Sequence, residues 1–67
     1  MASNIELYGV YYPIDSIVSS GKSTITIDSR VVVMEFLGEK AKVCRYGNYK
    51  ETAITGINNL SKIQTKR

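Results

Sequence analysis

The segment Ser19–Thr24, SSGKST, carries the Gly-Lys-Ser order with which a nucleotide-binding P-loop ends. A P-loop also needs a glycine five residues before this one and a helix directly after the lysine. Ser16 stands where the first glycine belongs, and the β-type sequence Ser-Thr-Ile-Thr-Ile follows Lys22. Because no helix N-terminus is expected to hold a phosphate here, we interpret Ser19–Thr24 as a turn between an N-terminal segment and the main sheet.

The remaining nucleophiles and acids lack the partners that catalysis requires. Cys44 is the one cysteine, and the sequence contains no histidine to act as its base. One cysteine also rules out a disulfide within the chain and a cysteine-based zinc site. The six carboxylates are spread along the chain, at Glu6, Asp15, Asp28, Glu35, Glu39 and Glu51. We therefore expect no enzyme activity, no cofactor and no bound metal.

Tyrosine and basic residues form the best candidate for a binding site. Five of the 67 residues are tyrosine, and two of them flank the Gly47-Asn48 dipeptide with basic residues close by. Tyrosine rings stack on nucleic acid bases while lysine and arginine neutralise phosphates. The same residues also anchor protein interfaces or cover the ends of a small core. The predicted site comprises Lys40, Lys42, Arg45, Tyr46, Tyr49 and Lys50.

A second apolar group lies closer to the N-terminus, at Tyr11, Tyr12 and Ile14, and Ile17-Val18 follows it. A domain of this size can bury only a limited apolar surface. The group either folds over one end of the domain as a lid or forms a surface for a partner or a second copy. We favour the lid.

The alternation of apolar and polar residues predicts the short strands that position these side chains. Pro13 should end the first strand, and the loop that follows has room for one helical turn within residues 14–18. Turns are expected at Gly38-Glu39 and, as a two-residue hairpin, at Gly47-Asn48. The predicted strands are residues 5–12, 24–27, 30–37, 41–46 and 50–55.

The pattern also assigns side chains of the central strands to faces, since successive residues of a strand point to opposite sides. Ala41 and Val43 should point into the core. In the strand before them, one face should carry Val32, Met34 and Phe36.

The segment Ala41–Ile63, AKVCRYGNYKETAITGINNLSKI, places a strand, a glycine-containing hairpin, a strand, a short turn and a last strand in order. Apolar residues at every third position from Ile57 predict a 3-10 turn near residues 57–60. This order resembles SH3-like barrels, including the KOW-type and Tudor-type domains. The resemblance implies a mainly β, five- to six-stranded small barrel, and OB-like and Sm-like barrels remain alternatives.

Length and composition fit one domain over residues 1–67, with an N-terminal strand and loop at 1–23, a main sheet at 24–63 and a basic tail at 64–67. The net charge of +3 permits nucleic acid or an acidic partner without demanding either. No signal-peptide pattern or membrane-spanning apolar run is visible. A lone cysteine fits a reducing compartment, so we expect a cytoplasmic protein.

The sequence thus predicts a non-enzymatic binding module, a small accessory or regulatory protein of the kind that phages and plasmids encode. We favour a protein partner, because a net charge of +3 is low for a nucleic-acid-binding domain and the basic residues are not concentrated in one segment. Binding of single-stranded DNA or RNA is the alternative, and association with a second copy stays open.

Overall fold

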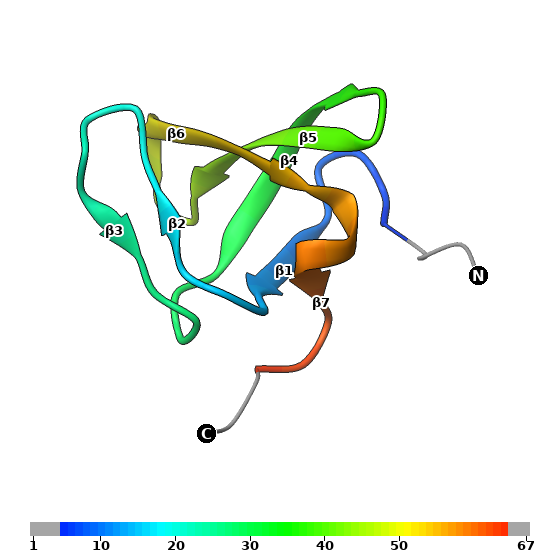
Figure 1. Ribbon diagram of the computed structural model, residues 1–67, viewed down its shortest axis with the longest axis horizontal. Helices are drawn as coiled ribbons and strands as arrows, with labels where there is room; N and C mark the ends of the chain where they lie inside the picture. The colour runs from blue at the N-terminus through cyan, green and yellow to red at the C-terminus, as the bar shows by residue number, and fades with distance from the viewer. Residues whose placement is uncertain (1–4, 65–67) are drawn as a thin grey trace.

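The computed structural model describes residues 5–64 as a mainly β structure, which confirms the fold class at this level. Residues 5–64 contain seven strands where five to six were expected, because the segment before Thr24 adds the short strand β2 and the end of the described chain adds β7. They form a five-stranded and a two-stranded antiparallel sheet, and no α-helix occurs between residues 5 and 64. The elements are drawn in Figure 1: β1 (Val10–Pro13), β2 (Ile17–Val18), β3 (Thr24–Ile25), β4 (Val31–Leu37), β5 (Lys40–Arg45), β6 (Asn48–Gly56), the 3-10 turn η1 (Ile57–Asn59) and β7 (Leu60–Ser61).

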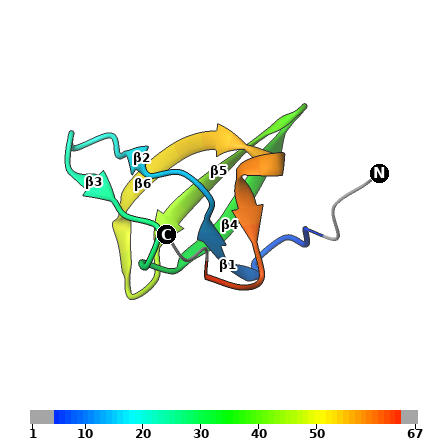
Figure 2. The same ribbon diagram turned by 60° about the horizontal axis from the view of Figure 1, so that its bottom comes forward.

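The five-stranded sheet has the order β6-β5-β4-β1-β7, in which β4, β5 and β6 form a meander. β1 has two partners in succession: its first two residues pair with β4, and its last two pair with β7. The two-stranded sheet is the hairpin β2–β3, which lies beside β6 (Figures 1 and 2). The Ser20 amide donates there to the Thr52 carbonyl at 2.7 Å, which ties the hairpin loop to β6.

The core lies between the main sheet and the β2–β3 hairpin. Ala41 and Val43 of β5 are fully buried, which confirms that they point inward. Ile17 and Ile25 pair across the hairpin and belong to the same cluster. Burial of an aliphatic side chain contributes about 1.5–3 kcal/mol, so this cluster dominates the stability of a small domain. Its members are Tyr11, Ile17, Ile25, Val31, Val33, Ala41, Val43, Ala53 and Leu60.

A β-bulge at Met34 changes the faces of β4. Val33 pairs with Val43, but Glu35 pairs with Lys42, so β4 has one extra residue between these two pairs. An extra residue inverts the facing of everything beyond it. Phe36 therefore pairs with the buried Ala41 and shares its side of the sheet, although Phe36 itself is 43% exposed at the end of β4. The prediction that Phe36 shares a face with Val32 and Met34 is wrong for this reason.

The N-terminal strand is shorter than the predicted 5–12. Tyr8 adopts a left-handed backbone conformation with φ of 65°, and the Gly9 amide donates to the Glu6 carbonyl at 3.0 Å. These two features place the segment before Val10 in a turn, so its alternation of apolar and polar residues does not correspond to a strand. Pairing begins only at Val10.

The loop after β1 is extended where one helical turn was expected, because Ile17–Val18 pairs with β3. β3 itself stops at Ile25, and the Ser29 amide closes a turn onto the Thr26 carbonyl at 3.0 Å. The segment Ser19–Thr24 does contain a turn, but Thr24 begins β3 and the turn joins the two strands of the small sheet. The expectation that it leads into the main sheet is wrong, because β3 pairs with β2 and not with the five-stranded sheet. Within the turn the Lys22 amide donates to the Ser19 carbonyl at 2.8 Å.

The β4–β5 turn at Gly38-Glu39 is present as predicted, with Gly38 at φ of 67°. The β5–β6 turn is Tyr46-Gly47, one residue earlier than predicted, because Arg45 pairs with Asn48. Gly47 has φ of 88°, a conformation that glycine adopts without the steric cost of a Cβ. This shift puts Tyr46 in the turn.

The predicted 3-10 turn is present at Ile57–Asn59 and leads directly into β7. Asn59 fixes this turn to the loop before β2. Its Oδ1 accepts from the Asp15 amide at 2.9 Å, and its Nδ2 donates to the Asp15 carbonyl at 3.1 Å. The Ile14 amide adds a bond to the Asn59 carbonyl at 2.8 Å. These bonds fasten η1 against the loop between β1 and β2.

Candidate binding groove

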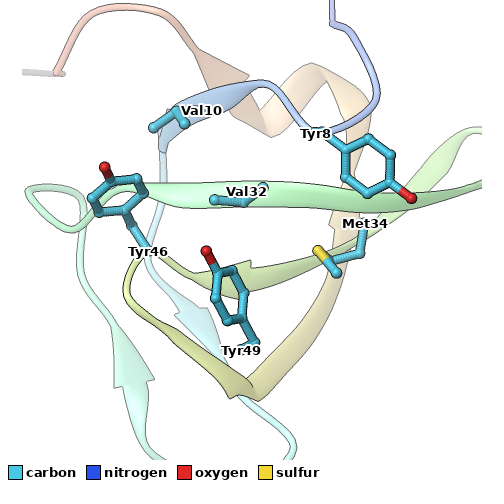
Figure 3. A pocket seen from close by; sticks show the side chains of 6 residues that line it. All are labelled: Tyr8, Val10, Val32, Met34, Tyr46 and Tyr49. Atoms are coloured by element: carbon cyan, nitrogen blue, oxygen red, sulfur yellow. The ribbon is translucent and has the colours of Figure 1, made fainter.

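An apolar groove of about 500 Å³ lies on the face of the sheet that points away from the core. Its floor is made by β1 and β4, where Val10 pairs with Val32. Figure 3 shows three tyrosine rings around this floor, from the turn before β1 and from the β5–β6 hairpin. We call it the tyrosine groove; it is lined by Tyr8, Val10, Val32, Met34, Tyr46 and Tyr49.

Tyr8 reaches the groove because the turn before β1 is held against β4. The Tyr8 amide donates to the Val33 carbonyl at 2.7 Å, and the Val33 amide donates to the Gly9 carbonyl at 3.1 Å. Gly9 is required at this point, since a Cβ there would lie 2.6 Å from the ring of the buried Tyr11. The core tyrosine therefore supports the turn that presents the groove tyrosine.

Tyr46 and Tyr49 reach the groove from the opposite end, on the β5–β6 hairpin. The Tyr46 amide donates to the Arg30 carbonyl at 2.9 Å, which holds the turn beside the start of β4. The pairing of β6 is irregular after the turn: Asn48 pairs with Arg45, and the next paired residue of β6 is Thr52. Tyr49 lies in this unpaired stretch.

The groove tyrosines are exposed to solvent, and their hydroxyls form no hydrogen bond within the described residues. Tyr8 is 65% exposed, Tyr46 50% and Tyr49 67%. Within residues 5–64 no side chain or backbone group hydrogen-bonds any of their hydroxyls. Tyr11 is the contrast, because its ring is buried and its hydroxyl accepts from the Glu6 amide at 2.8 Å. Three rings are therefore available to a ligand.

A cation stands next to the hairpin end of the groove, outside its lining. The Arg30 guanidinium sits over the Tyr46 ring, 4.4 Å from its centroid. Such a cation–π contact is worth about 0.5–1 kcal/mol at an exposed site, and it orients both side chains. Arg30 forms no ion pair with any carboxylate of the described chain.

Arg45, although it is adjacent to Tyr46 in sequence, is occupied within the protein. Its Nε donates to Glu51 Oε1 at 2.8 Å and its Nη2 to Glu51 Oε2 at 3.0 Å. The same guanidinium bonds Ser29 Oγ at 3.2 Å and the Thr24 carbonyl at 3.0 Å. Arg45, together with the Ser23 hydroxyl, lowers the pKa of Glu51 to about 2. Arg45 thus links β3 and the loop after it to the β5–β6 hairpin.

The predicted lysines do not gather around the groove. Lys50 follows Tyr49 on the hairpin and is exposed. Lys42 lies between Glu35 and Ile54 across the strands and lines a separate, smaller pocket. Lys40 is at the far end of β5, roughly 17 Å of strand away from Arg45. Of the predicted set, the structure brings together Tyr46 and Tyr49 with Lys50 beside them.

The predicted second apolar surface at Tyr11, Tyr12 and Ile14 is wrong for Tyr11, which is 4% exposed and part of the core. Because β1 begins at Val10, its odd-numbered residues point inward and Pro13 is buried as well. Tyr12 and Ile14 are half-buried. The segment belongs mainly to the core.

Four lining residues and the cation were not predicted as site residues. Val32 and Met34 carried a signal, since the alternation placed them on one face, but nothing local shows that this face stays open. Tyr8 reaches the groove through the turn before β1, and Val10 through its pairing with β4. The sequence pattern predicts neither the turn nor the pairing. Arg30 depends on the bond that holds Tyr46 beside it.

Other chemistry in the described chain is limited. Cys44 is buried beside Val32, and this burial raises the pKa of its thiol. Between residues 5 and 64 no three His, Cys, Asp or Glu side chains gather where they could hold a metal ion. The same stretch contains no helix long and apolar enough to cross a membrane.

Comparison with known proteins adds no relative. No protein-family model matches the chain, and searches of curated proteins and of solved structures find no match either. The tyrosine groove therefore has to be interpreted from its own residues.

Proposed function

We propose that this protein is a non-enzymatic binding module that binds another protein through the tyrosine groove. The observation that carries the proposal is the gathering of three solvent-facing tyrosine rings over an apolar floor. Tyrosine supplies a large contact area at a low cost in conformational entropy, since it has only two side-chain torsions. Rings of this kind are frequent anchors of protein interfaces.

We further infer that the domain is an SH3-like small barrel. Three features support this topology: a hairpin inserted after β1, a three-stranded meander, and a 3-10 turn leading into a last strand that pairs with β1. The bond from the Ser20 amide to the Thr52 carbonyl brings the hairpin loop against the outer edge of β6, as near-closure requires. An experimental structure in which β6 pairs with a different strand would favour the OB-like or Sm-like alternatives.

Single-stranded nucleic acid is the competing ligand, since bases stack on tyrosine rings. A protein partner is favoured because phosphates require cations along the groove. Arg45 is paired with Glu51, and Lys40 lies at the other end of β5.

A capture experiment with matched variants tests the proposal. The immobilised protein, the variant Tyr46→Ala/Tyr49→Ala, and the control Val18→Ala/Ile54→Ala would each be exposed to lysate of the source cells, with and without nuclease treatment. Val18 and Ile54 are exposed apolar residues outside the groove. We expect a protein that is retained by the wild type and the control but lost with the groove variant. Equal capture by the groove variant, or capture that nuclease abolishes, would contradict the proposal.

A further inference from the structure

Two cations lie next to the hairpin end of the tyrosine groove. Arg30 stacks on Tyr46, and Lys50 follows Tyr49 on the same hairpin. None of the six residues that line the groove is charged, so both cations lie just outside its lining. The hairpin end of the apolar groove is therefore bordered by positive charge.

The stacking contact leaves Arg30 prepared for a carboxylate. A guanidinium that lies over a ring uses its flat face, so the N–H groups along its edge remain free to donate. Those donors match a carboxylate in a two-point contact. Asp28 lies in the same polar cleft as Arg30 but forms no ion pair with it in the described chain, and its Oδ1 accepts from the Thr26 hydroxyl. Arg45, in that cleft too, is already paired with Glu51.

The length of the groove fits a short extended segment. From Arg30, the residue before β4, to Met34 the chain advances four residues, or roughly 13 Å. An extended peptide covers this distance with about four residues. The free hydroxyls of Tyr8, Tyr46 and Tyr49 stand along it and are able to donate to, or accept from, a peptide backbone.

From these observations we propose that the groove binds an extended acidic peptide segment, in which an apolar or aromatic anchor fills the channel and a carboxylate within about four residues of it pairs with Arg30. This inference rests on the proposed function and specifies the chemistry of the partner. The anchor supplies apolar contact with the floor at Val10 and Val32. The carboxylate fixes the direction in which the segment lies, because Arg30 stands beside Tyr46 at the hairpin end of the groove.

A displayed library of random 12-residue peptides tests the inference directly. Selection would use the wild type, the groove variant Tyr46→Ala/Tyr49→Ala, the charge reversal Arg30→Glu, and the control Lys40→Glu. Lys40 is an exposed cation at the far end of β5, so its reversal changes the net charge equally without touching the groove. Circular dichroism would verify that each variant is folded.

We expect the wild type and Lys40→Glu to enrich peptides that carry Asp or Glu close to an aromatic or aliphatic residue. A synthetic peptide of this kind should bind Arg30→Glu at least tenfold more weakly. Replacing its acidic residue by lysine should restore binding to Arg30→Glu. That exchange distinguishes a direct charge pair from a general loss of structure.

The outcomes separate the inference from the proposed function. Enriched peptides that need Tyr46 and Tyr49 but carry no acid, and that bind Arg30→Glu undiminished, overturn the inference and leave the binding module standing. A library that yields no groove-dependent peptide overturns the inference as well. If, in addition, the oligonucleotides dT20 or U20 bind and the groove variant loses them, nucleic acid replaces protein as the ligand.

Discussion

The two faces of the sheet formed by β1, β4 and β5 are built from neighbouring residues but differ in what covers them. On the core face, Val31, Val33 and Val43 are 0% exposed beneath the β2–β3 hairpin. On the groove face, Val32 is 8% exposed while Val10 beside it is 42% exposed. The apolar residues alone do not distinguish the two faces. The hairpin completes one face, and the other keeps its aromatic residues in solvent.

The same contrast holds for the two arginines beside Tyr46. Arg45 places its donors on Glu51, Ser29 and the Thr24 carbonyl, and so belongs to the fold. Arg30 contacts the ring of Tyr46 and leaves its donors for a ligand. Substitutions on the covered side should therefore change stability, whereas those on the open side should change binding.

The largest effect on stability should come from Ile25→Ala, which removes a fully buried side chain of the hairpin from the core. Truncation of a buried isoleucine to alanine costs about 2–5 kcal/mol, a large fraction of the stability of so small a domain. Urea unfolding followed by circular dichroism would measure the change. Val18→Ala, on the neighbouring strand at 67% exposure, serves as the control and should stay within about 0.5 kcal/mol. Equal losses in both variants would show that the hairpin does not cover the core.

Gly9→Ala tests the place where the two faces touch. The new Cβ would lie 2.6 Å from the Tyr11 ring, which is held in the core, so the turn that carries Tyr8 has to move. Overpacking of this kind costs about 1–3 kcal/mol. Gly21→Ala is the matched control, because no atom comes closer than 4.0 Å to a Cβ at that position. Thermal unfolding of both variants would decide, and unchanged stability in Gly9→Ala would contradict the support of Tyr8 by Tyr11.

The pair of Arg45 with Glu51 predicts an acid-dependent loss of stability. The pKa of Glu51 is about 2 in the folded protein, below its ordinary value of 4.5. A carboxylate with a lowered folded pKa stabilises the protein above its unfolded pKa, and this contribution is lost as the pH falls through the folded value. The unfolding midpoint of the wild type should therefore drop between about pH 4.5 and pH 2 more steeply than that of Glu51→Gln.

Glu39→Gln is the control for this titration, since Glu39 is exposed in the β4–β5 turn and its side chain makes no ion pair among residues 5–64. Its pH profile should follow that of the wild type. A Glu51→Gln profile parallel to the wild type from pH 5 to pH 2 would show that the Arg45–Glu51 ion pair does not stabilise the fold.

The sequence predicts those parts of the molecule in which local pattern and long-range packing agree. The strands around Val33 and Val43, the Gly38-Glu39 turn and the 3-10 turn all follow from periodicity and from the residues that turns require. Two of the groove residues, Tyr46 and Tyr49, could also be found, because they flank a hairpin dipeptide. These signals lie within a few residues of one another in the chain.

The remaining features depend on register, which no short segment determines. A single extra residue at Met34 moves Phe36 to the other side of the sheet. The left-handed Tyr8 ends the expected N-terminal strand and, with the late start of β1, turns Tyr11 inward. Arg30 and Tyr8 join the groove only through bonds to distant strands. The groove is assembled from three separate segments. Rules based on residue spacing within one segment therefore cannot predict it.

The smallest effect on stability, and the sharpest test of the open face, is expected for Tyr46→Ala/Tyr49→Ala. Both rings are at least half exposed and their hydroxyls bond nothing in the described chain, so loss of Tyr49 should change the free energy of unfolding by no more than about 0.5 kcal/mol. Loss of Tyr46 also removes its contact with Arg30 and should cost about 0.5–1 kcal/mol. Binding of a groove-selected peptide, measured by fluorescence anisotropy, should nevertheless fall at least tenfold, because truncation of an interface anchor typically costs 2 kcal/mol or more, about thirtyfold. A large loss of stability would mean that the rings complete the core, and the two faces would then differ in degree only. Full peptide affinity in a folded variant would instead place the ligand elsewhere. If the core face is covered and the groove face is exposed for a ligand, the variant should keep its stability and lose its binding.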